Sequence, residues 1–463
     1  MDFDSVLHQY QISYYKLPNS VKKFLGTLYG HVPLSIRFGK NYTIHKNVLN
    51  TFFDSDEQYK LDFQYVKTLE TLRFAYDNIP YYKKTFDSYG VKVENFKAIN
   101  DIKLFPELTK EIIQKNISDI YTDKFESVAE YYTGGSSSTP MKIYAPRSVS
   151  RSKEKIYILN AFSKIGYKYR DETVSLTARG HADEKNKKYW EYQKIDNYLL
   201  VSVNHLKFEF IEKIVDEISN FNSLYFYSFP SALIAFIKAC NIKGIKKMEQ
   251  VLGIMLVSES ISHEHIVFVQ SFFPNAEILS HYGHTERIIS AYRLNKEYYN
   301  FYNSYGLTRV VENELVGTSF DNFVMPYINY KTKDYVRGKI KFFNNTDIAI
   351  GAEEIHGRLQ EFVVTLDNTV IPVLSIGAGH FNSYDYVERA QFYQDTPGKV
   401  VLRIQTEYPK KINTHKIIEQ MEEQVNQKIK FTIVFIDKIQ NTHRRKNVLC
   451  VQNLDIEKYL KNT

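Results

Sequence analysis

The chain has 463 residues, of which 43% are hydrophobic and 24% charged, and its formal net charge is +7. This length is enough for a large domain and a smaller one, each with its own core. Because the lysines are scattered, the positive charge favours anionic ligands or surfaces and does not indicate nucleic-acid binding. With only two cysteines, Cys240 and Cys450, the sequence excludes a disulfide framework and a cysteine-rich zinc site.

The chain begins with an acidic stretch, Met1–Asp4, which lacks the apolar core of a signal peptide. No apolar run approaches the roughly 20 residues of a membrane span. We therefore expect a cytoplasmic protein with at most a peripheral association with membranes.

Residues 1 to about 75 are predicted to be helical, and near the end of this region Phe63, Val66, Leu69, Leu72 and Ala75 recur at helical spacing. Pro80 should end this helical region, since the residue before a proline is disfavoured in a helix. A second helix is expected at residues 81–89. Thr109 is a plausible N-cap for another helix.

The middle of the chain alternates strands with helices. Strands are expected at residues 173–177, 223–227, 253–257 and 276–280, and helices at residues 148–165, 230–240 and 262–273. This alternation predicts an α/β fold with mostly parallel, helix-covered sheets, in which ligands bind at the carboxyl ends of the strands. Residues 182–194 are mostly polar and are expected to form a surface loop.

The pattern changes around Gly357 and Arg358. Beyond this point the sequence predicts strands at residues 399–404 and 431–436 and a helical apolar stripe at residues 417–429. We therefore predict a large N-terminal domain, residues 1–358, and a small α+β C-terminal domain, residues 359–463.

A loop rich in glycine and hydroxyl groups lies at residues 131–140, with the sequence YYTGGSSSTP, between two expected short strands. Its glycines can turn backbone N–H groups toward one point, and its hydroxyls can donate to the oxygens of a polyphosphate. The alternative is an ordinary flexible turn. The loop is neither a Walker loop nor a dinucleotide fingerprint, because G-K-S/T and G-x-G-x-x-G are both absent.

Four further clusters could carry chemistry, and each has an ordinary alternative. They are residues 280–286 (SHYGHTE), 330–335 (YKTKDY), 357–361 (GRLQE) and 441–446 (NTHRRK). An aromatic ring next to glycine can lie beside a flat base, and a nearby carboxylate can hold Mg²⁺. The alternatives are a core tyrosine, a turn aspartate, a solvent salt bridge and a solvated basic loop.

In order and spacing, these clusters resemble the motifs of the adenylate-forming (acyl-activating) superfamily. The resemblance is to its phenylacetate–CoA ligase-like branch, which includes CapK-type members linked to capsule and other surface-polysaccharide synthesis. Residues 79–83 (IPYYK), 104–111 (LFPELTKE) and 227–231 (YSFPS) are also similar to segments of that branch. The resemblance covers nearly the whole chain, from about Asp62 to Lys446.

The resemblance implies an ATP- and Mg²⁺-dependent ligase that converts a carboxylic acid into an acyl adenylate. A thiol, amine or hydroxyl then accepts the acyl group; the acceptor could be CoA, an amino sugar or a carrier. It implies these positions: Thr133, Gly134, Gly135, Ser136, Ser137, Ser138 and Thr139 for the phosphates; Tyr282 for adenine; Asp334 and Arg358 for ribose; Glu286 for Mg²⁺; Lys446 for catalysis; and Glu361 as the hinge of a mobile C-terminal domain. Arg179, His181 and His281 are candidates for contacting the substrate, although a solvated arginine and a surface histidine are the simpler interpretation of the first two.

The sequence departs from the family pattern at several positions. Ser138 and Thr139 replace a usual glycine and a frequent lysine, Glu361 replaces a more usual aspartate, and Arg445 replaces the glycine that commonly precedes the catalytic lysine. The favoured function is the activation of a carboxylic acid as its adenylate for a modification in capsule, O-antigen or related surface-polysaccharide synthesis. A related alternative is an aryl- or acyl-CoA ligase. The substitutions at Ser138 and Thr139 also keep open a nucleotide-binding protein with weakened catalysis.

Overall fold

The computed structural model describes residues 17–124, 128–132, 141–177, 188–206, 208–261, 263–295, 297–356, 362–376, 386–387, 389–425, 427–439, 450–456 and 459. These residues form two compact units. The first comprises residues up to Arg170 with Gln193–Asn197 and Leu279–Ile355. The second comprises Asp171–Tyr192, Tyr198–Ile278 and the chain from His356 onward.

The first unit contains the N-terminal helices, a hairpin and an antiparallel sheet. Its helices are α3 (Asn19–His31), α4 (Leu34–Arg37), α5 (Lys40–Asp54), α6 (Glu57–Asn78), α7 (Pro80–Ser88), α8 (Lys110–Lys115) and α9 (Arg147–Ser163). Its strands are β1 (Val128–Tyr132), β2 (Lys142–Pro146), β9 (Ser290–Leu294), β10 (Tyr299–Phe301), β11 (Gly306–Val311), β12 (Glu314–Ser319), β13 (Tyr330–Phe342) and β14 (Ala349–His356). Strand β8 (Glu277–Gly283) runs from the second unit into the first.

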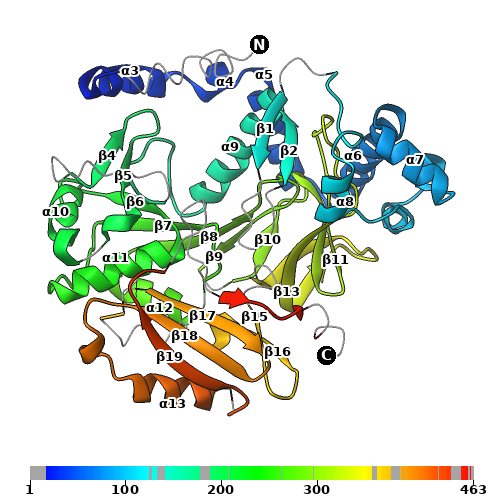
Figure 1. Cartoon of the computed structure of the whole chain (residues 1–463). Helices are drawn as coiled ribbons and strands as arrows, with labels where there is room; N and C mark the ends of the chain where they lie inside the picture. The colour runs from blue at the N-terminus through cyan, green and yellow to red at the C-terminus, as the bar shows by residue number, and fades with distance from the viewer. Residues whose placement is uncertain are drawn as a thin grey trace. The chain divides into compact units, whose positions relative to one another are not determined.

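Local sequence signals account for several helix boundaries in this unit. The Asp56 side chain accepts from the backbone N–H of Tyr59 and caps α6. Pro80 occupies the first turn of α7, which lies beside α6 at the right of Figure 1. Thr109 caps α8 by accepting from the N–H of Ile112, as the sequence predicted.

The sheet strands of the first unit follow the order β11-β12-β13-β14-β10-β9-β8. Neighbouring strands pair antiparallel at β11–β12, β12–β13, β14–β10, β10–β9 and β9–β8. Buried residues of α6 and α7, such as Leu72 and Phe86, share one core with sheet residues such as Leu315 and Ala349. This core holds the carboxyl end of β8 and the start of β13 in fixed positions.

The second unit contains the strand–helix alternation expected from the sequence. Its first elements are β3 (Thr173–Leu176), β4 (Trp190–Gln193), β5 (Tyr198–Val201), α10 (Phe208–Ile218), β6 (Leu224–Ser228), α11 (Pro230–Ile242), β7 (Val251–Val257) and α12 (His263–Phe272). Strands β3, β5, β6 and β7 pair in parallel, which agrees with the expected α/β class. The polar stretch at 182–194 is not loop throughout, because aromatic residues such as Trp190 and Tyr192 place β4 there and pack against the core.

Beyond His356, the described residues form a two-stranded hairpin, a separate four-stranded sheet and the helix α13. The elements are β15 (Phe362–Val364), β16 (Val370–Pro372), β17 (Arg389–Thr396), β18 (Lys399–Gln405), α13 (Thr414–Gln424), β19 (Lys430–Ile436) and β20 (Cys450–Gln452). The strand order is β19-β18-β17-β20, and α13 lies along this sheet in Figure 1. The expected α+β character of this segment is present, while the domain boundary at residues 358–359 stays a prediction.

Candidate functional site

The turn after β8 contains Thr285 and Glu286, the last two residues of the 280–286 cluster. Tyr282 and Gly283 are still paired with β9, opposite Ala291 and Ser290. The chain then turns sharply, with the N–H of Arg287 donating to the carbonyl of His284 at 3.1 Å. Arg287 has φ of 57°, in the left-handed region that non-glycine residues rarely adopt. This turn fixes the positions of the residues at 285 and 286.

The Glu286 carboxylate is buried and held from two sides. Its Oε1 accepts from the Tyr330 hydroxyl at 3.1 Å, and its Oε2 lies 3.3 Å from His284 Nδ1. Because His284 Nε2 accepts the backbone N–H of Ile289 at 3.2 Å, the proton of the neutral ring lies on Nδ1 and points to Glu286. The carboxylate is therefore oriented before any ligand binds.

Tyr282 and Asp334 meet although 52 residues separate them in the sequence. The Tyr282 hydroxyl donates to Asp334 Oδ2 at 2.6 Å, a short, charge-assisted hydrogen bond. Burial and the negative charge of Asp334 both raise the pKa of Tyr282 well above its ordinary value. The phenol therefore keeps its proton at neutral pH and acts as the donor.

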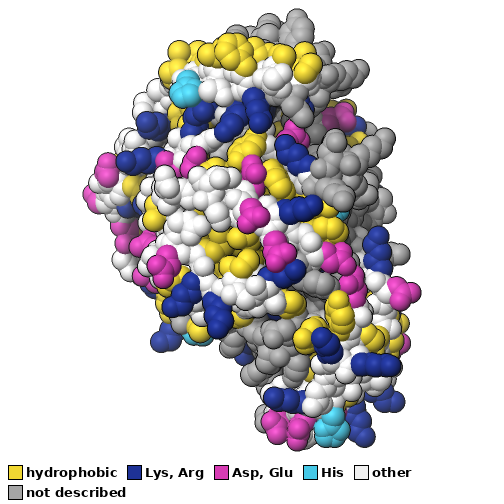
Figure 2. Space-filling view, turned by 90° about the vertical axis from the view of Figure 1, so that its left-hand side faces the viewer, with side chains coloured by type: hydrophobic (Ala, Val, Ile, Leu, Met, Phe, Trp, Pro, Cys, Tyr) yellow, Lys and Arg dark blue, Asp and Glu magenta, His cyan; other side chains and the backbone are white. Residues whose placement is uncertain are grey.

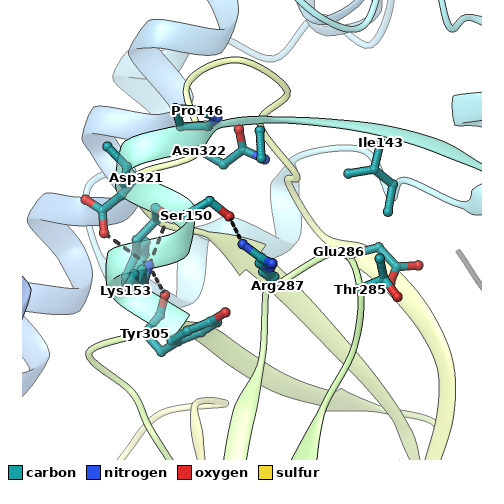
Figure 3. A pocket seen from close by; sticks show the side chains of 13 residues that line it. Ile143, Pro146, Ser150, Lys153, Thr285, Glu286, Arg287, Tyr305, Asp321 and Asn322 are labelled. Atoms are coloured by element: carbon teal, nitrogen blue, oxygen red, sulfur yellow. Dashed lines mark hydrogen bonds and ion pairs between the residues drawn. The ribbon is translucent and has the colours of Figure 1, made fainter. Parts of the chain in front are cut away.

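A pocket lies next to this turn, as Figure 3 shows. Its volume is about 360 Å³, part of which is open to solvent. It is lined by Ile143, Ala145, Pro146, Val149, Ser150, Lys153, Thr285, Glu286, Arg287, Tyr305, Phe320, Asp321 and Asn322. These residues come from β2, from the first half of α9, from the turn after β8, from the position just before β11 and from the segment that follows β12. The pocket thus combines two cations, two carboxylates and several hydroxyl groups.

Arg287 connects this turn to the hairpin that flanks the glycine-rich loop. Its guanidinium donates to the Ser150 hydroxyl on α9 and lies 4.6 Å from the ring centroid of Tyr131. Tyr131 belongs to β1, which pairs antiparallel with β2, so that Tyr132 and Lys142 face each other on either side of the loop. The two strands expected around this loop are therefore confirmed, and one of them contacts the Glu286 turn.

A buried charge cluster forms one wall of the pocket. Lys153 Nζ donates to Asp321 Oδ2 at 3.1 Å and to the backbone carbonyls of Tyr305 and Phe320 at 2.7 and 3.1 Å. Burial would raise the pKa of Asp321, but the charge of Lys153, together with His45 and Lys67, lowers it to about 2. Asp321 is therefore ionised throughout the physiological range.

His281 is one of the predicted substrate-contacting residues. Its Nε2 lies 3.2 Å from the Ser290 hydroxyl. Burial lowers the pKa of its ring, against the opposing charge of Glu154. The ring is therefore neutral at pH 7 and can donate or accept one hydrogen bond.

The remaining predicted site residues lie outside the described residues. They are Thr133 to Thr139 of the loop, Arg179, His181, Arg358, Glu361 and Lys446. Of the predicted nucleotide-binding residues that are described, Tyr282 and Asp334 are in direct contact, and Glu286 lies on the turn that follows the strand of Tyr282.

The donor set around Glu286 fits Mg²⁺ in the manner of nucleotide-dependent enzymes. Among the described residues, no group of three or more His, Cys, Asp or Glu side chains could enclose a metal by itself. Mg²⁺ commonly takes one or two carboxylates and completes its shell with phosphate oxygens and water. A carboxylate oxygen has two lone pairs, so the Glu286 carboxylate can accept hydrogen bonds and bind a cation at the same time.

The comparisons with known proteins agree with the motifs. No protein-family model matches the chain. Over 394 residues the chain is 22% identical to Protein CapK of Staphylococcus aureus. The aligned region covers 81% of this chain and 86% of CapK. A segment of 46 residues is 39% identical to the phenylacetate-coenzyme A ligase of Escherichia coli (strain K12), covering 10% of each chain.

Among solved structures, the chain is similar to 2-hydroxyisobutyryl-CoA ligase in the postadenylation state in complex with 2-HIB-AMP. The TM-score is 0.61 at 12% identity, and the match covers 86% of this chain and 91% of that one. A second structure of the same ligase, in complex with R3-HIB-AMP, matches with the same TM-score at 11% identity. The chain has the fold of the adenylate-forming enzymes. The resemblance inferred from the motifs is thereby confirmed in fold, and it is matched in sequence by the similarity to CapK.

Within this adenylate-forming fold, several residues of the site had no short sequence signal. Lys153 is one of several lysines near α9, and Asp321 follows a strand without a recognisable motif. Tyr330 belongs to the Asp334 cluster and Arg287 directly follows Glu286, so both were close to the motifs but had no role assigned. Only the fold shows that Tyr330 reaches Glu286 and that Arg287 reaches the hairpin.

Proposed function

We propose that this chain is an ATP-dependent, AMP-forming ligase that activates a carboxylic acid as its acyl adenylate and transfers the acyl group to an acceptor. The similarity to CapK along four-fifths of the chain suggests a role in capsule or related surface-polysaccharide synthesis. The similar CoA ligases support the activation step and make CoA a candidate acceptor.

The observation that carries this proposal is the preorganised pair of carboxylates at the end of β8 and the start of β13. Glu286 is oriented by Tyr330 and His284, and Asp334 is oriented by Tyr282. Two carboxylates held in this way suit one Mg²⁺-bound nucleotide, with Glu286 toward the phosphates and Asp334 toward the ribose hydroxyls.

In the proposed reaction, a carboxylate oxygen of the substrate attacks the α-phosphorus of ATP, and the bond between that phosphorus and the bridging oxygen to the β-phosphate breaks. Pyrophosphate leaves, and the acyl adenylate remains. The nucleophile of the acceptor then attacks the acyl carbon, and AMP leaves with the electron pair. When bound, Mg²⁺ neutralises charge on the phosphate oxygens.

The chain's own residues would bind and orient the reactants. Asp334 would accept from the ribose hydroxyls while Tyr282 keeps its carboxylate in place and offers a ring beside the base. Residues 133–139 would donate to the outer phosphates, and Arg358 would bind the ribose. Lys446 would stabilise the negative charge that accumulates as two anions approach each other. We further propose that residues 359–463 form a mobile domain that carries Lys446 and turns at Glu361 between the two half-reactions.

Pyrophosphate release across a panel of carboxylic acids, with hydroxylamine to trap the acyl adenylate, tests the proposal. We expect ATP- and acid-dependent pyrophosphate release and a hydroxamate product. Nucleotide binding without pyrophosphate release for any acid would instead favour the weakened, binding-only alternative. Comparing CoA with amino-sugar acceptors in the second half-reaction separates a CoA ligase from a polysaccharide-modifying enzyme.

The variant Glu286→Gln and the control Glu94→Gln make this test specific to the site. Glu94 is an exposed glutamate of the same unit. We expect the first variant to lose most pyrophosphate release and the second to match the unmodified protein. Equal loss in both variants would point to instability and not to a catalytic role of Glu286.

A further inference from the structure

Helix α3 carries an apolar stripe that faces away from the protein. Val21, Phe24, Leu25 and Leu28 recur at the i, i+3, i+4, i+7 spacing of one helix face. On a surface helix this face normally packs on the core. Here the four side chains have exposed fractions of 39%, 64%, 41% and 55%. Figure 2 shows hydrophobic side chains gathered in a row at the top of the view, at the height of α3 in Figure 1.

The opposite face of α3 explains this inverted orientation. Gly26 and Gly30 are buried on that side. A Cβ atom at position 30 would lie 1.5 Å from Arg170 Nη1 and 2.5 Å from the carbonyl oxygen of Ile195. Only glycine permits such a close approach, so the helix is attached by its small residues. The apolar stripe therefore faces solvent. Ile36 on the next helix, α4, extends this exposed apolar surface and is 59% exposed.

The charged side chains in this part of the sequence have a single sign. From Leu17 to Phe53 the chain has five lysine or arginine residues and no aspartate or glutamate. Lys22 and Lys23 lie on α3 itself, and Lys40 and Lys46 are exposed on α5. The stripe is an exposed apolar face flanked by lysines, with no acidic residue near it in the sequence. Such a face fits a surface that has an apolar interior under a layer of anionic groups.

We propose that α3 docks on a membrane surface that contains anionic phospholipids. The helix has 13 residues and is about 20 Å long, so it lies in the interface with Phe24 and Leu28 inserted among the acyl chains and the lysines at the phosphate level. No described helix is long and apolar enough to cross a bilayer, so attachment through α3 is peripheral. This inference concerns a surface distinct from the carboxylate cluster and does not depend on the proposed activity.

Charge favours a lipid surface over a second copy of the chain. In a symmetric dimer the same patch would face itself and would bring two sets of lysines together. Like charges facing each other across an interface disfavour association. An anionic headgroup layer removes this repulsion and takes up the apolar side chains at the same time.

The test is sedimentation of the full-length protein with vesicles of phosphatidylcholine mixed with phosphatidylglycerol. We expect binding that weakens as salt is raised and is lost on pure phosphatidylcholine. The variants Phe24→Ser/Leu28→Ser and Lys22→Gln/Lys23→Gln should each weaken binding by about tenfold or more, since each removes one of the two contributions. Because Lys23, Phe24 and Leu28 are exposed and Lys22 is partly exposed, the thermal unfolding midpoint should stay unchanged.

A matched control is Leu252→Ser/Val267→Ser, which replaces two exposed apolar residues, 43% and 48% exposed, of the second unit. It should bind vesicles like the unmodified protein. The proposal is overturned if the protein does not bind anionic vesicles, or if Phe24→Ser/Leu28→Ser binds them unchanged. A dimer that dissociates in this variant would also overturn it, by assigning the stripe to a second copy.

Discussion

The contact between Tyr282 and Asp334 gives the sharpest test of the proposed nucleotide site. Tyr282→Phe retains the ring but removes the hydroxyl group that donates to Asp334 Oδ2 at 2.6 Å. A hydrogen bond to a charged acceptor contributes about 1.5–3 kcal/mol. Both side chains are only half-buried, so we expect the lower end of this range. ATP affinity should therefore fall about tenfold, because the carboxylate is no longer held toward the ribose.

Calorimetric titration with ATP measures this effect, and a double-mutant cycle assigns it to the contact. We expect Tyr282→Phe and Asp334→Asn to be non-additive, with a coupling free energy of about 1 kcal/mol or more. Tyr282→Ala should weaken binding further, by roughly 1–3 kcal/mol, if the ring also stacks on adenine. Additive effects within about 0.5 kcal/mol would refute the idea that the tyrosine acts through Asp334.

Three other predictions concern the metal, the catalytic lysine and the charge cluster. Glu286→Gln should raise the Mg²⁺ concentration needed for half-maximal pyrophosphate release, and an identical Mg²⁺ titration would contradict metal binding there. Lys446→Ala should slow adenylate formation by about a hundredfold or more, measured in a single turnover, with little change in ATP affinity. Asp321→Asn leaves Lys153 buried without its counter-charge and should lower the unfolding free energy by about 3–5 kcal/mol at pH 7. Because the folded-state pKa of Asp321 is about 2 and its ordinary value 3.8, this difference should persist above about pH 4 and shrink as the pH falls toward 2; a pH-independent difference in urea unfolding would contradict it.

Local features of this protein followed from the sequence because they depend on neighbouring residues. Thr109 caps its helix through a backbone N–H three residues away, and Pro80 sets a boundary through its own ring. The continuous apolar run of β7 identified a strand buried on both faces. The motifs around Tyr282 and Asp334 likewise indicated the adenylate-forming fold, because each is a short continuous segment.

Contacts between distant segments were decided only by the tertiary structure. Tyr282 meets Asp334 across 52 residues and Lys153 meets Asp321 across 168, and no local pattern encodes such a separation. The direction of the apolar stripe on α3 was also decided by tertiary packing, because the close fit of Gly30 against Arg170 turns that stripe outward. The sequence alone thus determined the elements and the family resemblance, whereas side-chain packing decided which charged and apolar groups meet, since that depends on how the whole chain closes on itself.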